Sequence, residues 1–184
     1  MFTVSIFKHP SGTFPLGFEY MSQSAKEESD YYEIIKTKIE EVMKNKFKES
    51  YLEITSKRKF SKKLKHEIAL TNRDIIFYFL QDTAPDMTGF VKEEFSTYFF
   101  IAEIKREKIK LGDIYQTRKY SELFNAKYSL LISTEEIPEE IIKLSKVVFT
   151  LLNGGHGYDR ITLVHYDPDK GNFVEWFEKN PFEK

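Results

Sequence analysis

Apolar residues near the start of the chain recur with the spacing of a helix that is buried on one side. Residues 24–48 begin with a capping-box pattern, Ser24 followed three residues later by Glu27. The apolar stripe that follows has a period of about 3.6 residues and consists of Tyr32, Ile35, Ile39, Val42 and Met43. The pattern predicts an amphipathic helix over this range.

Most other apolar runs are short and bounded by turn residues, which is typical of strands. Two of them, 74–80 and 128–133, are apolar on both faces and are therefore expected at the centre of a sheet. The remaining predicted strands are 1–7, 51–55, 86–91, 97–105 and 160–166, and residues 173–177 form an aromatic element near the end of the sequence. Helical spacing returns over 112–126 and over 138–152, where Pro138 lies in the first turn and glycines follow Asn153.

These elements predict an α/β protein with a central sheet flanked by helices. The chain has 184 residues, enough to bury a substantial core. Repeats, low-complexity stretches and linkers are absent from the sequence. We therefore expect a single domain over 1–184, with a core over about 25–135 and a further helix and strands over 136–184.

Composition excludes several classes of site. The chain has no cysteine, which excludes disulfides and sulfur-ligated zinc, and its four histidines lack a paired metal-binding spacing. Its formal charge of -1 gives no global attraction to nucleic acid. No apolar run approaches the length of a membrane span, and no leader-like segment opens the chain. A soluble, cytoplasmic protein without a membrane partner is expected.

One segment is locally very basic. We interpret residues 57–70 as a hairpin, although their pattern is ambiguous. Six positive charges fall within nine of these residues: Lys57, Arg58, Lys59, Lys62, Lys63 and Lys65. They form either a solvated surface or an arm that contacts phosphates, and the second interpretation predicts binding that weakens with salt.

The strand at 97–105 ends in an unusual pair of charges. Alternate side chains share a face of a strand, so Glu103 and Lys105 project to the same side, about 6.6 Å apart. Phe99 and Ile101 precede them on that face. Glu103-Ile104-Lys105 is the one acid-x-Lys match in the sequence. The charges are either a solvated strand end or part of a reactive site.

A second acid is expected to join this pair. Pro85-Asp86 opens the preceding strand, and pairing of the two strands as a hairpin would bring Asp86 and Glu103 to one edge. Two carboxylates suit Mg²⁺, with Mn²⁺ as a substitute. Lys105 could then orient or deprotonate an attacking water, or stabilise charge on phosphorus.

Together these motifs resemble the PD-(D/E)xK nuclease superfamily. The match is Pro85-Asp86, Glu103-Ile104-Lys105, and Gln116-Thr-Arg-Lys-Tyr120, which is similar to the QxxxY signature of some branches. It covers about residues 28–135. The resemblance implies a restriction-endonuclease-like core, a mixed sheet with the order αβββαβ, carrying N- and C-terminal additions.

The resemblance also implies roles for individual residues. Asp86 and Glu103 would bind the metal, aided by the Ile104 carbonyl, and Lys105 would be the catalytic lysine. Gln116 and Tyr120 would support the site or touch the nucleic acid. The family usually adds an acid from its first helix. We expect Glu40, or failing that Glu33, because both lie on a flank of the buried stripe.

Inert interpretations exist for the same residues. Asp113 can cap the helix over 112–126 with Gln116 as its capping-box partner, and Tyr120 can be a packed core residue. The dipeptide Pro168-Asp169 repeats Pro-Asp with no acid-x-Lys strand after it.

The leading hypothesis is a Mg²⁺-dependent endonuclease that acts on nucleic acid, with DNA as the favoured substrate. A homodimer is compatible with this hypothesis, because enzymes that cut duplexes often act as symmetric dimers. An alternative is a catalytically inactive nuclease-fold protein that binds nucleic acid or a protein partner. In a third reading, the aromatic residues of 171–184 dock a partner.

Overall fold

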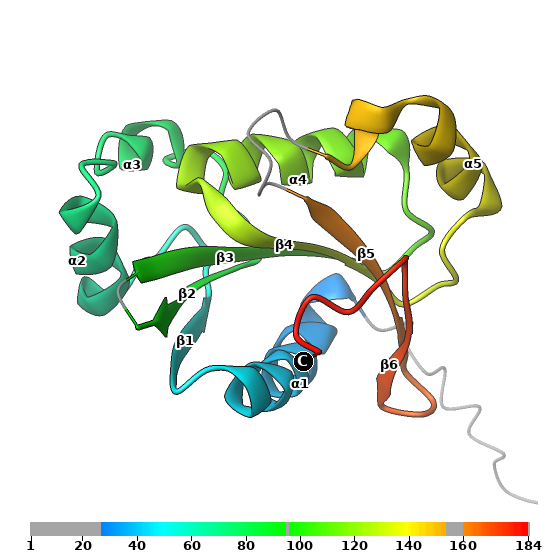
Figure 1. Ribbon diagram of the computed structural model, residues 1–184, viewed down its shortest axis with the longest axis horizontal. Helices are drawn as coiled ribbons and strands as arrows, with labels where there is room; N and C mark the ends of the chain where they lie inside the picture. The colour runs from blue at the N-terminus through cyan, green and yellow to red at the C-terminus, as the bar shows by residue number, and fades with distance from the viewer. Residues whose placement is uncertain (1–26, 95, 154–159, 184) are drawn as a thin grey trace, which may run out of the picture.

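The fold is built on one six-stranded mixed sheet (Figure 1). The computed structural model describes residues 27–94, 96–153 and 160–183. The strands lie in sequence order across the sheet: β1 (Glu49–Ile54), β2 (Met87–Glu93), β3 (Ser96–Lys105), β4 (Ala126–Ser133), β5 (Ile161–Asp167) and β6 (Asn172–Trp176). Antiparallel pairing joins β1, β2 and β3, parallel pairing joins β3, β4 and β5, and β6 returns antiparallel to β5.

Helices cover both faces of this sheet (Figure 1). One face carries α1 (Tyr32–Lys46), preceded by the short 3-10 helix η1 (Glu28–Tyr31). The other carries α4 (Leu111–Phe124), with its flanking elements α2 (Lys62–Leu70), α3 (Ile76–Phe79), α5 (Glu139–Val147) and η2 (Phe149–Leu151). This is the α/β class that the hydrophobic pattern predicts, and the expected order αβββαβ is present as α1, β1, β2, β3, α4 and β4.

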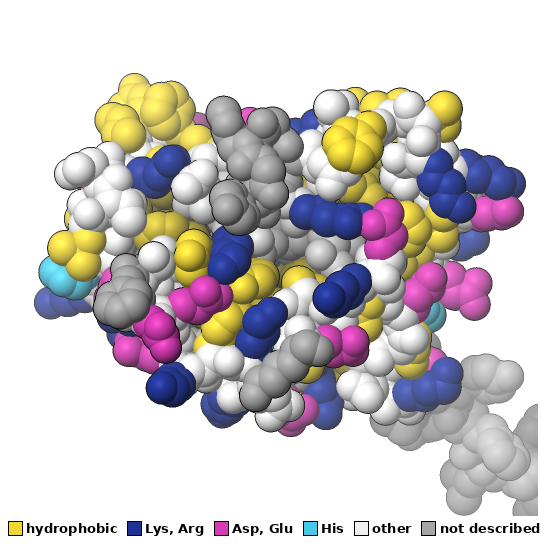
Figure 2. Space-filling model, viewed as in Figure 1, with side chains coloured by type: hydrophobic (Ala, Val, Ile, Leu, Met, Phe, Trp, Pro, Cys, Tyr) yellow, Lys and Arg dark blue, Asp and Glu magenta, His cyan; other side chains and the backbone are white. Residues whose placement is uncertain are grey.

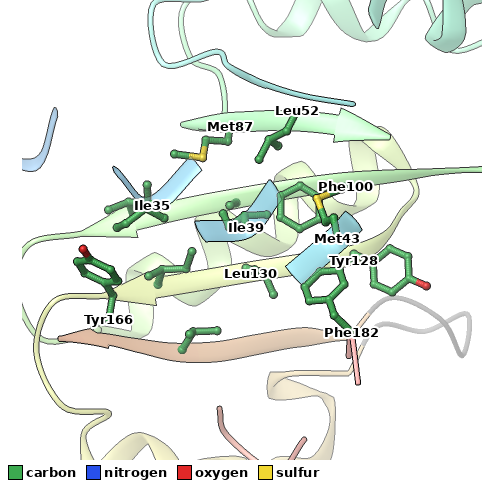
Figure 3. Packing of buried hydrophobic residues seen from close by; sticks show 14 of the residues in the cluster. Ile35, Ile39, Met43, Leu52, Met87, Phe100, Tyr128, Leu130, Tyr166 and Phe182 are labelled. Atoms are coloured by element: carbon green, nitrogen blue, oxygen red, sulfur yellow. The ribbon is translucent and has the colours of Figure 1, made fainter. Parts of the chain in front are cut away.

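Strand β3 is buried on both faces because it lies near the middle of the sheet. Phe100, Ala102 and Ile104 point to the α1 side, where the stripe residues Ile35, Ile39 and Met43 are fully buried (Figure 3). Phe99 and Ile101 point to the opposite side and pack with residues of α2, α3 and α4. The predicted alternation along this strand is confirmed. It places Glu103 and Lys105 on the α4 side.

Two predictions between β1 and β2 are wrong. The basic segment forms α2 rather than a hairpin, because Ser61 Oγ caps the helix by accepting the Leu64 N–H at 3.1 Å. Residues 74–80 contain the short helix α3 and do not form a central strand. Ile76 and Leu80, four residues apart, are buried, whereas the intervening Tyr78 and Phe79 are exposed. Apolar content alone did not reveal this helical spacing.

The C-terminal segment packs against the core on the α1 side of the sheet. Phe182 is 4% exposed, and its ring lies against the rings of Phe47, Phe100, Tyr128 and Trp176. Lys46 Nζ also donates a hydrogen bond of 2.6 Å to the carbonyl oxygen of Pro181. The reading in which the aromatic residues here dock a partner is therefore wrong for Phe182.

Other expectations have mixed outcomes. The helix predicted over 138–152 ends at Val147 and gives way to η2. The strand over 1–7 and the capping residue Ser24 lie outside the described residues. Within the described ranges, the helices are too short or too polar to cross a bilayer.

Candidate active site

Asp86 lies immediately before β2 and is anchored by hydrogen bonds. The next residue, Met87, pairs with Ala102 of β3, so the expected hairpin pairing of the two strands is confirmed. The Asp86 carbonyl oxygen accepts the Thr55 N–H at 2.7 Å, and its Oδ2 accepts the Ile104 N–H at 2.8 Å. The side chain is 7% exposed. Asp86 therefore lies against the backbone of the Glu103-Ile104-Lys105 motif.

Glu103 is almost completely buried beside it. One carboxylate oxygen, Oε2, accepts a hydrogen bond of 2.8 Å from Gln116 Nε2 and lies 3.6 Å from Lys105 Nζ. Among the described residues, nothing hydrogen-bonds to the other oxygen, Oε1. A buried, unpartnered carboxylate oxygen is costly unless a ligand satisfies it. The geometry therefore points to a cation or a polar ligand at this oxygen.

Tyr32, which precedes the buried part of α1, joins the site from the opposite face. Its hydroxyl lies 2.7 Å from Asp86 Oδ1 and 3.2 Å from Glu28 Oε1. The tyrosine was expected only as part of the apolar stripe. Glu28 begins η1 and Tyr32, four residues later, begins α1, so the two side chains lie on the same side of this helical segment. The spacing links Glu28 to Tyr32 but does not show that either reaches Asp86, so neither residue was predicted for the site.

Neither Glu40 nor Glu33 joins this group. Glu40 forms an ion pair of 2.9 Å with Lys36, and it lies eight residues beyond Tyr32, about 12 Å along the helix axis. Glu33 is exposed. The expected contribution of Glu40 is therefore corrected: Glu28 is the acid from the first helical segment that approaches Asp86.

Burial and mutual repulsion disturb the titration of the two acids. Burial raises the pKa of Asp86, although the Ile104 N–H and Tyr32 hydroxyl oppose the shift. Burial and the nearby Asp86 charge raise the pKa of Glu103 to about 8, against the influence of Lys105. Burial alone would lower the pKa of Lys105, but Glu103, Glu28 and Asp86 raise it overall. Lys105 is therefore a cation at neutral pH.

The shift on Glu103 predicts a pH-dependent stability. Between pH 4.5, where the unfolded chain ionises this group, and about pH 8, the folded protein binds more protons than the unfolded chain. The free energy of unfolding of the metal-free protein should therefore fall as the pH rises through this window. Urea denaturation at several pH values would measure it. Glu103→Gln should show a smaller fall, and equal slopes in the two proteins would contradict the assignment.

Gln116 and Tyr120 have different partners. Helix α4 begins at Leu111, and the Asp113 carboxylate accepts the Lys110 N–H at 2.7 Å, so Asp113 closes the capping box itself. Gln116 is thereby free of the inert capping role and bonds Glu103. Tyr120 is fully buried in the core, and its hydroxyl is hydrogen-bonded with Thr83 Oγ1 in the loop before Pro85. Tyr120 thus touches the loop that carries Asp86.

The basic segment divides into two parts. The first, Lys57–Lys59, is a turn beside Asp86, since Ser56 donates its N–H to the Asp86 carbonyl at 3.2 Å and Arg58 donates from its guanidinium to the Gln81 carbonyl at 3.1 Å. The second part is on α2. There Lys63 lies over the Tyr51 ring at 4.7 Å and Lys65 over the Phe77 ring at 5.6 Å, and all three lysines of this part, including Lys62, are exposed.

A cleft of about 310 Å³ opens beside the acids. Lys105 contributes to its wall together with Glu28. Its full lining is Glu27, Glu28, Lys105, Arg106, Glu107, Lys108, Lys110 and Asp113. Four of these eight side chains are cationic and four are acidic, so the cleft has a lining of mixed charge.

The donor set fits a hard divalent cation that keeps several waters. Asp86 and Glu103 supply carboxylate oxygens, and Glu103 Oε1 lacks a partner among the described residues. No cluster of three or more histidine, cysteine, aspartate or glutamate ligands surrounds one point in the part of the chain that the structure describes. The arrangement suits Mg²⁺ better than a metal that needs a full protein cage.

Comparison with known proteins does not assign the chain to a family. No family model matches it, and no curated protein matches it. The chain is similar to the crystal structure of the pre-specific restriction endonuclease BsaWI in complex with DNA, with 14% identity and a TM-score of 0.39. The similarity covers 73% of this chain and 48% of that one, so this chain spans about half the length of that protein.

Proposed function

We propose that this protein is a metal-dependent nuclease that hydrolyses phosphodiester bonds, with DNA as the substrate. One observation carries the proposal: Glu103, buried next to Asp86 and Lys105, keeps a carboxylate oxygen without a hydrogen-bond partner among the described residues. Lys105 also lines a cleft of about 310 Å³, which gives a phosphate room beside this lysine.

Asp86 and Glu103 are the residues that would hold Mg²⁺ or Mn²⁺, with the Ile104 carbonyl and Glu28 as further oxygen donors nearby. When bound, such an ion lowers the pKa of its water and offsets negative charge on a phosphoryl group. Gln116 fixes one oxygen of Glu103, and the Ile104 N–H fixes one oxygen of Asp86. These contacts hold both carboxylates in place before a ligand arrives.

Lys105 has a role that its charge defines. Because the neighbouring carboxylates raise its pKa, Lys105 remains protonated near pH 7 and is a poor general base. A fixed ammonium in a mostly buried site instead stabilises the charge that develops on the phosphate. Of the three roles considered for this lysine, we therefore propose charge stabilisation.

Nucleic-acid contacts are proposed for the basic turn rather than for the whole basic segment. Lys57, Arg58 and Lys59 are exposed next to the loop of Asp86. Lys63 and Lys65 on α2 are also exposed, but their ammonium groups lie over the rings of Tyr51 and Phe77. Since phosphate contacts release counterions, binding through the turn should weaken steeply with salt. Lys62, Lys63 and Lys65 would add a weaker contribution.

A cleavage assay tests the proposal directly. Purified protein is incubated with plasmid, single-stranded and branched DNA and with RNA, in Mg²⁺, Mn²⁺ or EDTA. We expect metal-dependent cutting that Asp86→Ala and Lys105→Ala each abolish. Asp169→Ala, in the exposed Pro168-Asp169 turn, is the matched control and should cut normally. Cutting that survives Asp86→Ala would refute the mechanism.

The inactive alternative has one observation in its favour, the lack of a third carboxylate clustered with Asp86 and Glu103 among the described residues. A nuclease-fold binder would retain nucleic acid, leave it intact in every metal, and lose little affinity on Lys105→Ala. The same assay, run with a binding measurement, separates the two functions.

Tyr32 is expected to position Asp86 for the metal. Tyr32→Phe removes the hydroxyl that lies 2.7 Å from Asp86 Oδ1 and should weaken Mn²⁺ affinity about tenfold, as loss of an outer-shell partner does. Isothermal titration calorimetry measures this affinity. Tyr51→Phe, whose hydroxyl bonds Glu53 and Ser61 instead, is the control. Equal Mn²⁺ affinities in wild type and Tyr32→Phe would show that the hydroxyl has no such role.

A further inference from the structure

An exposed aromatic patch lies on the solvent-facing side of α3. Tyr78 is 68% exposed and Phe79 60%, and their rings meet edge to face with centroids 5.4 Å apart. Ile75 and Leu70 are each 65% exposed in the same region of the chain. Figure 2 shows the corresponding cluster of hydrophobic side chains over α3, at the upper left. Large apolar groups gathered in this way mark a binding surface.

The charge around this patch selects an anionic partner. Residues 57–82 contain seven lysines and arginines and three acids, of which Asp74 and Asp82 are exposed beside α3 and the third is Glu67. Glu67 is buried and pairs with Lys92 at 2.9 Å, so it does not offset the exposed cations. The surface therefore combines aromatic rings with positive charge. Single-stranded nucleic acid has the complementary chemistry, since it offers both bare bases and phosphates.

The patch is connected to the candidate active site by a short, hydrogen-bonded path. Gln81, two residues after Phe79, accepts a hydrogen bond of 3.1 Å from the Arg58 guanidinium. Arg58 donates its backbone N–H to Thr55, and Thr55 donates its own N–H to the Asp86 carbonyl at 2.7 Å. The basic turn thus lies between the aromatic pair and Asp86.

We propose that α3 is a stacking platform for a single-stranded segment of the substrate. Bases would stack on Tyr78 and Phe79, and the phosphates that follow would contact the turn Lys57–Lys59 on the way to Asp86. In a duplex the bases are already stacked on one another, so the rings would gain little there. This inference rests on the proposed nuclease function and narrows its substrate to nucleic acid with a single-stranded part.

Filter binding in EDTA tests the platform without cleavage. The double variant Tyr78→Ala/Phe79→Ala is compared with wild type on a single-stranded oligonucleotide and on its duplex. Loss of stacking should weaken single-strand binding about tenfold per ring and leave duplex binding unchanged. Phe79→Tyr should retain wild-type affinity. Phe149→Ala, which removes a ring that is 77% exposed on η2, is the matched control and should bind normally.

Several outcomes would overturn the platform. These are an unchanged single-strand affinity in the double variant, an equal loss on duplex, or the same loss in Phe149→Ala. A change from dimer to monomer in light scattering, with affinity unchanged, would show that a second copy covers the patch. Ring-dependent binding without any cleavage would sustain the platform and refute the nuclease proposal, so the two failures are distinguishable.

Discussion

Glu103→Gln is expected to abolish cleavage while making the metal-free protein more stable. The substitution keeps the size of a side chain that is 1% exposed but removes a negative charge that Asp86 repels. We expect the cleavage rate to fall on the order of a thousand-fold. This corresponds to several kcal/mol of lost stabilisation of the transition state by the bound metal. Near pH 8, the free energy of unfolding of the metal-free protein should rise by about 1 kcal/mol, because the variant no longer buries an ionised carboxylate at position 103.

Cleavage rates and thermal melting, each with and without Mn²⁺, measure these effects. In wild type, Mn²⁺ should raise the melting temperature, and in Glu103→Gln it should not. Glu175→Gln, on the exposed part of β6, is the control and should behave as wild type in both assays. A metal-free Glu103→Gln protein that melts at a lower temperature than wild type would contradict the prediction that the Glu103 carboxylate destabilises the fold.

Gly89→Ala is expected to have the largest effect on stability. A Cβ at this position would lie 2.1 Å from the carbonyl oxygen of Tyr51 and 3.0 Å from the Cα of Leu52, so the backbones of β1 and β2 would have to separate. Overpacking of this kind typically costs about 1–3 kcal/mol, and a clash with backbone belongs at the upper end of that range. Because β1 leads to Thr55, the anchor of Asp86, activity should fall as well.

Gly112→Ala provides the opposite result at a matched glycine. It lies in the first turn of α4 with nothing within 4 Å of an added Cβ, so alanine should stabilise the helix by up to about 1 kcal/mol. Urea denaturation followed by circular dichroism compares the two variants. If Gly89→Ala unfolded at the same urea concentration as wild type, the close approach of β1 and β2 would be refuted.

The sequence predicted the parts of the fold in which burial follows a regular period. Ile35, Ile39 and Met43 identify α1, and the alternation along β3 identifies its two faces, because in both cases the core selects every buried position. The same reasoning failed for α3. There the exposed rings of Tyr78 and Phe79 look like core residues in the sequence, and only the structure shows that nothing covers them among the described residues.

The candidate site was predictable to the extent that it is local. Glu103 and Lys105 share a strand face, and Asp86 reaches them through a hairpin of adjacent strands. Glu28 and Tyr32 were out of reach, because they come from a helical segment more than fifty residues before Asp86 along the chain. Their approach depends on how α1 crosses the sheet, and no short-range pattern encodes that crossing.

Trp176 gives this fold a built-in optical probe. It is the one tryptophan of the chain, and its ring lies 5.2 Å from Phe173 and 6.1 Å from the buried Phe182. Its emission should therefore respond when the end of the chain detaches from the α1 face. Since Glu103 and Lys105 point to the opposite face, spectral changes on heating can report loosening of one layer separately from loss of catalysis in the other.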